Sequence, residues 1–143
     1  MSDGYDVYLS GPLFTPGDRH YLEQIDKICQ SFGLKTYLPH KDAGLSSYDG
    51  KDFLDFFEKD IEAIKGCRIV IAVLNGLIDS GTAWEMGYAF SLGKEIIGIC
   101  EDTRIPSPSS SINLMLACSA KIVSTKGELE QELNAMRKRL SLF

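Results

Sequence analysis

Signals of membrane insertion and export are missing from this 143-residue chain. Its longest apolar run, residues 69–74, is far shorter than the roughly 20 residues of a membrane-spanning helix. The first residues show no basic segment followed by an apolar one, so no secretory signal is visible. We therefore expect a soluble, cytoplasmic protein with no membrane partner.

Cysteine and histidine are too few and too scattered to predict a metal centre. The four cysteines form no Cys-x-x-Cys pair, and the two histidines complete no zinc-ligand spacing. Two of the cysteines lie at the edges of strand-like runs, where cysteine behaves as a small hydrophobic residue. We expect buried reduced thiols rather than metal ligands or disulfides at Cys29, Cys67, Cys100 and Cys118.

The common nucleotide-binding fingerprints and a basic surface are also absent. The chain has no Gly-x-Gly-x-x-Gly and no Gly-Lys-Ser/Thr motif, so it carries neither the dinucleotide fingerprint nor the phosphate loop. With 15 basic and 20 acidic residues, its net charge is −5 and its pI is about 5.0. This charge argues against a nucleic acid polymer as the main partner, whereas a small ligand can still bind at a local site.

What the chain contains is typical of one globular domain over residues 1–143, with 44% hydrophobic and 24% charged residues. Strand-like runs at 6–10, 35–38, 68–74, 95–100 and 121–123 alternate with helical periodicity at 18–32, 53–66, 82–92 and 126–140. Residues 113–117 predict a short helical turn, and 40–50, 75–81 and 101–111 predict loops. The alternation predicts an α/β fold, in which helices wrap a parallel sheet on both sides. Ligands bind such sheets at the carboxyl ends of the strands.

The segment 79–89, DSGTAWEMGYA, follows a buried strand and opens a helix. Glu85 lies in the predicted first turn, where a carboxylate is favoured in the charged form that a nucleophile needs. However, Thr82 and Glu85 also match the capping box Thr-x-x-Glu, which would make Glu85 a structural cap. Asp79 brings a second carboxylate to the same loop, and Gly81 and Gly87 suggest the close approach of a backbone or ligand. These two features favour the active-site interpretation.

Two further side chains are weaker candidates. Asp60 falls on the apolar stripe of the predicted helix 53–66, where burial should raise its pKa and let it hold a proton near neutral pH. The alternative is a partly exposed Asp60 paired with Lys59 or Arg68. Tyr8 lies on the first predicted strand, before the Gly-Pro turn, and alone is more typical of a core residue. Residues 111–115 alone are typical of an N-cap before a short helix.

Taken together, these segments resemble the nucleoside 2-deoxyribosyltransferase family over nearly the whole chain. The matching pieces are YLSGPLF at 8–14, Asp60 with Ile61 and Ile64, DSGTAWEMGYA at 79–89 and INLM at 112–115. The resemblance implies a flavodoxin-like, doubly wound α/β fold with five parallel strands in the order 2-1-3-4-5. It also implies a homo-oligomer whose sites are completed by a neighbouring subunit.

The resemblance assigns a role to each matched side chain. Glu85 would displace the base from a 2′-deoxynucleoside and form a covalent deoxyribosyl intermediate, while Asp60 would protonate the leaving base and Tyr8 would orient Glu85. A free nucleobase would then take the sugar with net retention, without a metal or an organic cofactor. The implied substrate contacts are Asp79 on the sugar hydroxyls, Phe14 against the base, Gly11, and Asn113 and Met115 from the adjacent subunit.

Two other functions stay open on the sequence. A hydrolase of the same scaffold would cleave 2′-deoxynucleosides or their 5′-monophosphates with water. Relatives that hydrolyse monophosphates carry a Ser and an Arg after the first strand, whereas Pro12 and Leu13 stand in the turn here, which favours an unphosphorylated substrate. Arg19 and the serine cluster at 107–111 are alternative phosphate contacts. The competing function of another class is a non-catalytic nucleotide-binding or signalling module.

Overall fold

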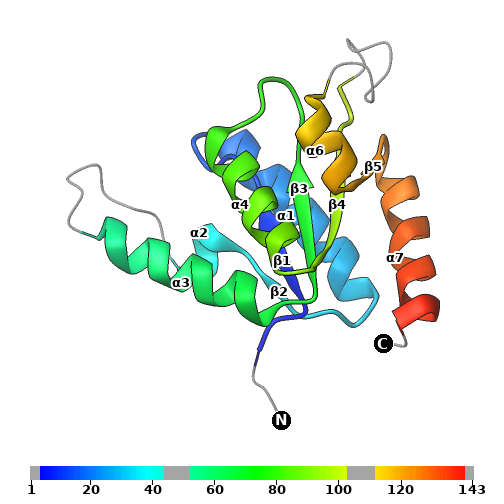
Figure 1. The fold of residues 1–143 in the computed structure, drawn as a ribbon, viewed down its shortest axis with the longest axis horizontal. Helices are drawn as coiled ribbons and strands as arrows, with labels where there is room; N and C mark the ends of the chain where they lie inside the picture. Colours follow the sequence, from blue (N-terminus) through cyan, green and yellow to red (C-terminus); the bar gives the residue numbers. More distant parts are fainter. Residues whose placement is uncertain (1–3, 44–51, 103–111, 141–143) are drawn as a thin grey trace.

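Five parallel strands pair in the order β2-β1-β3-β4-β5 in the computed structural model, which describes residues 4–43, 52–102 and 112–140. The predicted doubly wound sheet and its strand order are therefore confirmed (Figure 1). The strands are β1 Val7–Ser10, β2 Thr36–Tyr37, β3 Ile69–Val73, β4 Glu95–Ile99 and β5 Lys121–Val123. The helices are α1 Pro16–Ser31, α2 Pro39–Asp42, α3 Phe53–Gly66, α4 Ser80–Ser91, α6 Leu114–Ser119 and α7 Lys126–Leu140.

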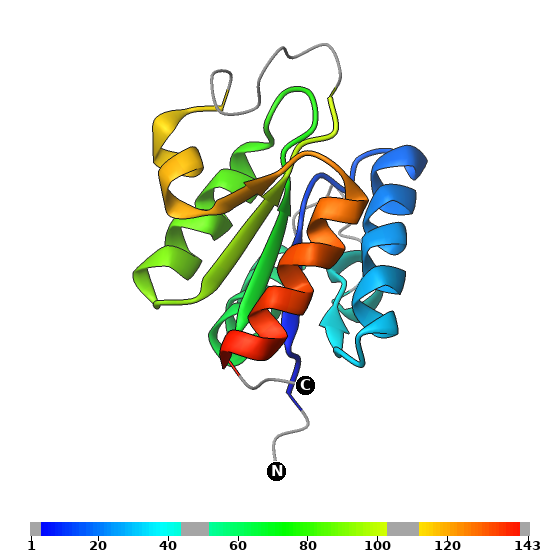
Figure 2. The same cartoon turned by 90° about the vertical axis from the view of Figure 1, so that its right-hand side faces the viewer.

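Helices cover both faces of the sheet, and the alternation of side chains along each strand supplies both cores. On one face, Val7 and Leu9 of β1 pack with buried residues of α1 and α7. On the other face, Tyr8 packs with buried residues of α3 and α4, and α6 adds partly buried ones. Figure 2 shows α1 and α7 on one side of the sheet and α4 and α6 on the other. Because every strand is covered twice, β3 reads as an unbroken apolar run.

Most predicted elements are correct to within a few residues, and the departures at α1 and α2 have local causes. Helix α1 begins at Pro16 rather than at residue 18, because Thr15 and Asp18 form a reciprocal capping box. Residues 39–42, predicted as loop, form the short helix α2. Pro39 presets the backbone at its first position, and the Asp42 carboxylate accepts a 2.7 Å hydrogen bond from the Leu38 amide. The predicted loop residues 44–50 and 103–111, with the serine cluster, lie outside the described residues.

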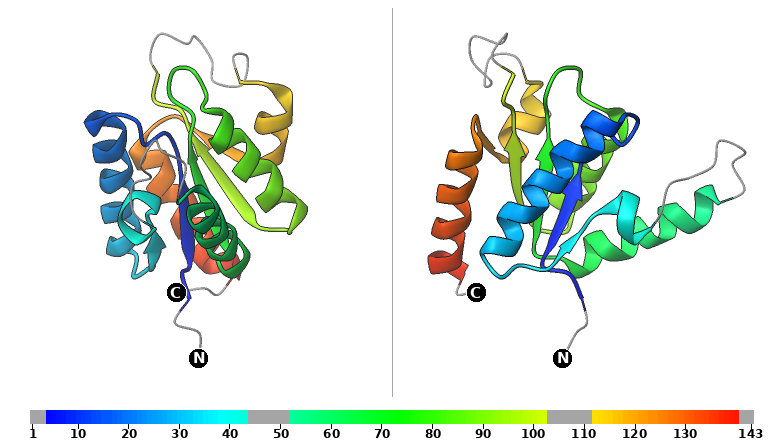
Figure 3. Two further views of the ribbon diagram at one scale, coloured as in Figure 1. Left: turned by 90° about the vertical axis from the view of Figure 1, so that its left-hand side faces the viewer. Right: turned by 180° about the vertical axis from the view of Figure 1, so that it is seen from behind.

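The apolar stripe of α3 is not a core stripe along its whole length, as the sequence suggested. Only Ala63 and Ile64 of this helix are buried. Phe53 and Phe57 are 53% and 52% exposed, because the amino-terminal half of α3 projects away from the sheet (Figure 3). This projection leaves aromatic side chains free to line a surface pocket instead of the core.

Three of the four cysteines match the expectation of buried thiols. Cys29, Cys67 and Cys100 are buried and unbridged, whereas Cys118 on the short helix α6 is exposed, so the prediction is wrong for Cys118. Helix α6 contributes no fully buried residue, which explains why its cysteine stays on the surface. Among the described residues, no helix has both the length and the apolar character needed to cross a membrane.

Candidate active site

Glu85 lies in the second turn of α4, and it does not cap the helix. Asp79 is the N-cap residue: its Oδ2 accepts hydrogen bonds from the Thr82 amide at 3.0 Å and from the Thr82 hydroxyl at 3.2 Å. The capping box of Thr82 with Glu85 is therefore wrong. It failed because α4 begins at Ser80, two residues before the predicted start, so a different carboxylate reaches the free amide.

The carboxylate of Glu85 instead points to β1, where two hydroxyls hold it. The Tyr8 hydroxyl donates to Oε2, and the Ser10 hydroxyl donates to Oε1 at 2.7 Å. Tyr8 and Ser10 are two residues apart on one strand, so their side chains leave the sheet on the same face, which α4 covers. Each carboxylate oxygen thus has its own donor.

Burial, together with smaller contributions from the negative charges of Asp60 and Asp79, raises the pKa of Glu85 from 4.5 to about 7. The hydrogen bonds from Tyr8 and Ser10 act in the opposite direction, because they stabilise the charged form. Burial and the neighbouring Glu85 raise the pKa of Tyr8 far above its usual range, so Tyr8 remains a neutral donor. The two hydroxyl donors therefore lower the cost of charging a carboxylate that burial favours in its protonated form.

Asp60 is held by a second tyrosine. The Tyr37 hydroxyl donates to Asp60 Oδ1 at 2.9 Å, rather than Lys59 or Arg68 pairing with the carboxylate. Burial raises the pKa of Asp60, as predicted, and the Tyr37 hydrogen bond opposes that rise. The rings of Tyr8 and Tyr37 stack with centroids 5.4 Å apart and planes 12° apart. Two stacked tyrosines therefore hold two carboxylates on the same side of the sheet.

Both carboxylates line one pocket of about 830 Å³ at the carboxyl ends of the strands. This volume suits a small organic ligand. The pocket brings together six of the eight candidate site residues: Tyr8, Gly11, Phe14, Asp60, Asp79 and Glu85. Phe14, which is 70% exposed, lies at the rim.

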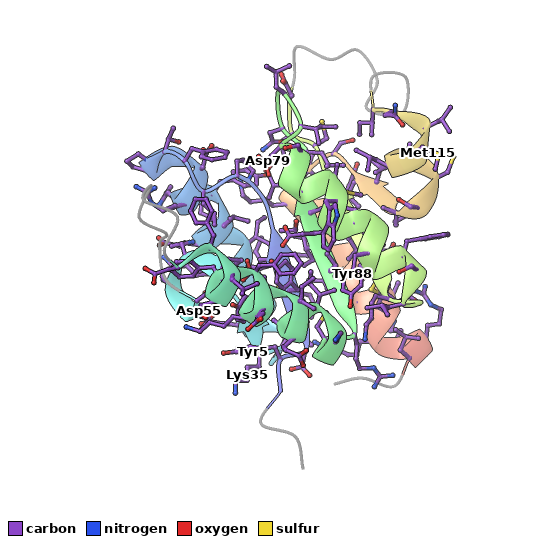
Figure 4. The ribbon with its side chains drawn as sticks, turned by 60° about the vertical axis from the view of Figure 1, so that its left-hand side comes forward. Tyr5, Lys35, Asp55, Asp79, Tyr88 and Met115 are labelled. Carbon is purple, nitrogen blue, oxygen red and sulfur yellow. The ribbon has the colours of Figure 1, made fainter. Side chains whose placement is uncertain are left out.

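Aromatic side chains from α3 and α4 form much of the remaining wall. Phe56, Phe57 and Trp84 line the pocket, and the Phe57 and Trp84 rings lie 5.9 Å apart. Trp84 stacks in turn on Tyr88, with centroids 5.4 Å apart. Figure 4 shows Tyr88 further along α4 from Asp79, which stands at the start of that helix. The arrangement offers flat apolar surface to a planar ring beside two acids.

The glycines of the site have different explanations. A Cβ at Gly11 would lie 3.2 Å from Val73 Cβ, so the turn after β1 can approach β3 only without a side chain. At Gly81 a Cβ would lie 3.0 Å from Asp79 Oδ2, so this glycine leaves room for the capping carboxylate. Among the described residues, nothing lies within 4 Å of a Cβ at Gly87, so the expected close approach of a backbone is absent there, whereas the approach of a ligand stays a prediction.

Asn113 and Met115 lie away from the pocket within one chain. Asn113 is the N-cap of α6, and its Oδ1 accepts a 2.9 Å hydrogen bond from the Met115 amide. Met115 is 72% exposed, and Figure 4 shows it on α6, with α4 between it and Asp55 of α3. Their role in the site of an adjacent subunit stays a prediction.

Sequence reasoning missed three contributors to the site. Ser10 lies in the motif at residues 8–14 and has no predicted role, although a hydroxyl at the end of a buried strand is itself a signal of polar contact. Tyr37 lies in a predicted strand, and only the pairing of β1 with β2 brings it beside Tyr8. Trp84 of α4 had no predicted role because its contact with Phe57 depends on the projecting half of α3.

A second cleft, of about 480 Å³, shares no lining residue with this pocket. It lies between Tyr5, α2 and α3 and is lined by Lys59 and four carboxylates, those of Asp42, Asp55, Glu58 and Glu62. It contains none of the candidate residues, so the larger pocket is the candidate active site. Within the parts of the chain that the structure describes, no cluster of His, Cys, Asp and Glu side chains is arranged to hold a metal ion.

The chain is similar to one known protein family and to solved structures of several enzymes. Residues 7–121 match the family described as nucleoside 2-deoxyribosyltransferase. A 2-deoxyribosyltransferase from the psychrotolerant bacterium Bacillus psychrosaccharolyticus has the same fold, with a TM-score of 0.72 and 24% identity over 87% of this chain and 90% of that one. A 2-deoxyribosyltransferase from Leishmania mexicana has a TM-score of 0.66 and 22% identity over 87% of this chain and 93% of that one. A CMP N-glycosidase from Clostridium botulinum has a TM-score of 0.55 and 21% identity over 90% of this chain and 98% of that one. A search of curated protein sequences gave no match.

Proposed function

This chain belongs to the nucleoside 2-deoxyribosyltransferase family, and from that premise we propose that it transfers 2′-deoxyribose between nucleobases. The observation that carries the proposal is the pair of carboxylates in one aromatic-lined pocket, with Glu85 bound by two hydroxyls and Asp60 by one. One carboxylate is prepared to be charged and the other to carry a proton, as two displacements at a sugar carbon require.

In the first half-reaction, a Glu85 oxygen attacks C1′ of the bound deoxynucleoside. The C1′–N bond breaks, its electron pair goes to the base nitrogen, and Asp60 supplies a proton to the leaving base. In the second half-reaction, a nitrogen of the incoming base attacks C1′ from the opposite side. The bond between C1′ and the Glu85 oxygen breaks, and its electron pair returns to Glu85. Asp60 then takes back a proton. Two inversions give net retention.

The two acids need opposite protonation states, and their mutual repulsion favours a single proton on the pair. Glu85 accepts hydrogen bonds from two hydroxyls, whereas Tyr37 alone is the described donor to Asp60. We propose that the pair holds its single proton on Asp60 when the base departs, because the two donors to Glu85 offset part of the burial that raises the pKa of Glu85. Tyr8 serves to orient Glu85, since its hydroxyl donates to the carboxylate.

The substrate contacts follow the walls of the pocket. We assign the aromatic rings of Phe57 and Trp84 to the faces of the base, with Phe14 at the rim and Gly11 beside it. Asp79 keeps its Oδ2 on Thr82, which leaves the other oxygen for a sugar hydroxyl. In a homo-oligomer, the exposed Asn113 and Met115 would complete the site of a neighbouring subunit. The substrates are a 2′-deoxynucleoside and a free nucleobase, and the chemistry calls for no cofactor.

Hydrolysis is the second candidate, and Arg19 is the observation that favours it. This guanidinium lines the pocket, where it donates to the Leu13 carbonyl at 2.8 Å and could also meet a 5′-phosphate. Water would then replace the second base, as in an N-glycosidase. If Arg19→Gln lowers kcat/KM for a 5′-monophosphate at least tenfold more than for the nucleoside, the phosphorylated substrate is the better assignment.

Intact-protein mass spectrometry after mixing with 2′-deoxynucleosides tests the transferase mechanism. The expected result is a mass gain of one deoxyribosyl unit that disappears in Glu85→Ala and on addition of an acceptor base, with formation of a new deoxynucleoside. Release of free deoxyribose faster than base exchange would identify a hydrolase. Unchanged turnover in a folded Glu85→Ala protein would reject Glu85 as the nucleophile, and no turnover in the wild type would favour the binding module.

A further inference from the structure

Ser10 makes an unusual contact for a buried serine. In helices α1, α4 and α6, Ser31, Ser91 and Ser119 donate to the carbonyl three residues earlier in their own helix. Such bonds stabilise local backbone. Ser10 is fully buried at the end of β1, yet its hydroxyl crosses to another element and donates to Glu85 Oε1 at 2.7 Å. The contact joins a strand to the side chain at the centre of the pocket.

The surroundings of Glu85 give this hydroxyl a specific task. The charged and titratable groups that face Glu85 are Tyr8 from β1, Asp60 from α3 and Asp79 from the start of α4, and both acids disfavour its charge. Arg19 of α1 lines the same pocket but bonds to a backbone carbonyl. Hydroxyl donors on β1 therefore supply the described hydrogen bonds to the carboxylate.

We propose that Ser10 is a positioning residue, whose hydroxyl holds Oε1 of Glu85 while Tyr8 holds Oε2, so that the carboxylate stays charged and keeps one orientation toward the substrate. Ser10 itself is fully buried and acts through Glu85 rather than on the substrate. The catalytic meaning of this contact rests on the proposed function, because it takes Glu85 as the nucleophile. The effect of Ser10 on the charge of Glu85 does not depend on the proposed function.

The first test is the pH profile of kcat/KM for deoxyribosyl transfer in Ser10→Ala. Loss of one hydrogen bond to a carboxylate should move the acid limb upward by about one pH unit, because protonated Glu85 persists to higher pH. Below the limb, kcat/KM should fall about tenfold relative to the wild type, and most of this loss should disappear at alkaline pH. Ser10→Thr keeps the hydroxyl and should restore the acid limb.

A matched control separates this effect from general damage. Ser91→Ala removes an exposed hydroxyl at the far end of α4, which donates only to the local Tyr88 carbonyl, and should leave the profile unchanged. A Ser10→Ala protein that loses activity equally at every pH, with no displacement of the acid limb, would show a merely structural serine. That outcome would overturn the inference.

A direct titration keeps the inference separate from the proposed function. The Glu85 carboxyl resonance in carbon-13-labelled protein, identified by its loss in Glu85→Gln, should titrate about one pH unit higher in Ser10→Ala than in the wild type. An unchanged titration refutes the role of Ser10 even if transfer activity is normal. Conversely, a displaced titration with full activity in Glu85→Ala would support the contact and reject Glu85 as nucleophile.

Discussion

Ionising Glu85 should cost the folded protein stability, and this cost can be measured without knowing the substrate. Burial raises the pKa of Glu85 from 4.5 to about 7 in the folded state. At about 1.4 kcal/mol per pH unit, the charged carboxylate lowers the free energy of unfolding by at most roughly 3.5 kcal/mol. Glu85→Gln removes the titration while keeping a side chain of similar shape, and should therefore stabilise the protein at alkaline pH.

The sign of the effect follows from the two protonation equilibria. Below pH 4.5 the carboxyl is protonated in both states, so it adds no pH dependence. Between 4.5 and about 7 the unfolded chain releases its proton while the folded protein retains it, and the free energy of unfolding falls as pH rises. Above about pH 7 the carboxylate is ionised in both states, and the full loss in the free energy of unfolding remains. The gain in Glu85→Gln should thus grow through this window and then level off.

Urea unfolding of both proteins at a series of pH values from about 4 to 9 gives the difference directly, because all other titrating groups are shared. A constant offset from the exchanged amide is expected and does not affect the slope. Glu58→Gln, at an exposed position on α3, controls for the loss of one surface carboxylate. The difference in the free energy of unfolding between Glu85→Gln and the wild type should grow between pH 4.5 and about 7. If it is constant over this range, or decreases as pH rises, Glu85 is not a buried carboxylate with a raised pKa.

Three kinetic predictions follow from the same geometry. Asp60→Asn should slow the departure of natural bases about 10²-fold or more and activated bases much less; equal slowing of the two leaving groups in steady-state assays would argue against an acid. Tyr37→Phe removes the hydrogen bond that lowers the pKa of Asp60, so the alkaline limb of the pH profile should move upward, and a downward movement would refute that link. Asn113→Ala should raise KM, and mixing it with Glu85→Ala should restore some activity; no recovery in co-refolded oligomers would show that each site comes from one chain.

The fold could be predicted from sequence because its signals are local and agree with one another. The unbroken apolar runs of β3 and β4 require cover on both faces, and the predicted limits of α7 and β5 coincide with those of the structure. Boundary errors arose where a cap outcompeted the periodicity, as at Thr15 and Asp79. Such caps depend on which carboxylate reaches a free amide, and several acids near each helix start satisfy the same sequence pattern.

The site was less predictable, because its contacts join segments that are far apart in the chain. Glu85 and Asp60 can be chosen as candidates from their positions in helices, but no local pattern shows that Ser10 and Tyr8 hold one carboxylate and Tyr37 the other. The exposed aromatic wall was also missed. An apolar stripe predicts a buried helix face, and only the projection of α3 beyond the sheet turns that stripe into a pocket wall.

The strand pairing explains how the two acids are kept in a fixed relation. Tyr8 of β1 and Tyr37 of β2 are direct partners across a parallel pair, whose strands lie about 4.8 Å apart, and their rings stack at 5.4 Å. One ring carries the hydroxyl that holds Glu85, and the other carries the hydroxyl that holds Asp60. A slip of β2 by one residue would turn Tyr37 to the opposite face of the sheet and release Asp60. The spacing of nucleophile and acid is therefore anchored in backbone hydrogen bonds of the sheet, even though neither acid belongs to a strand.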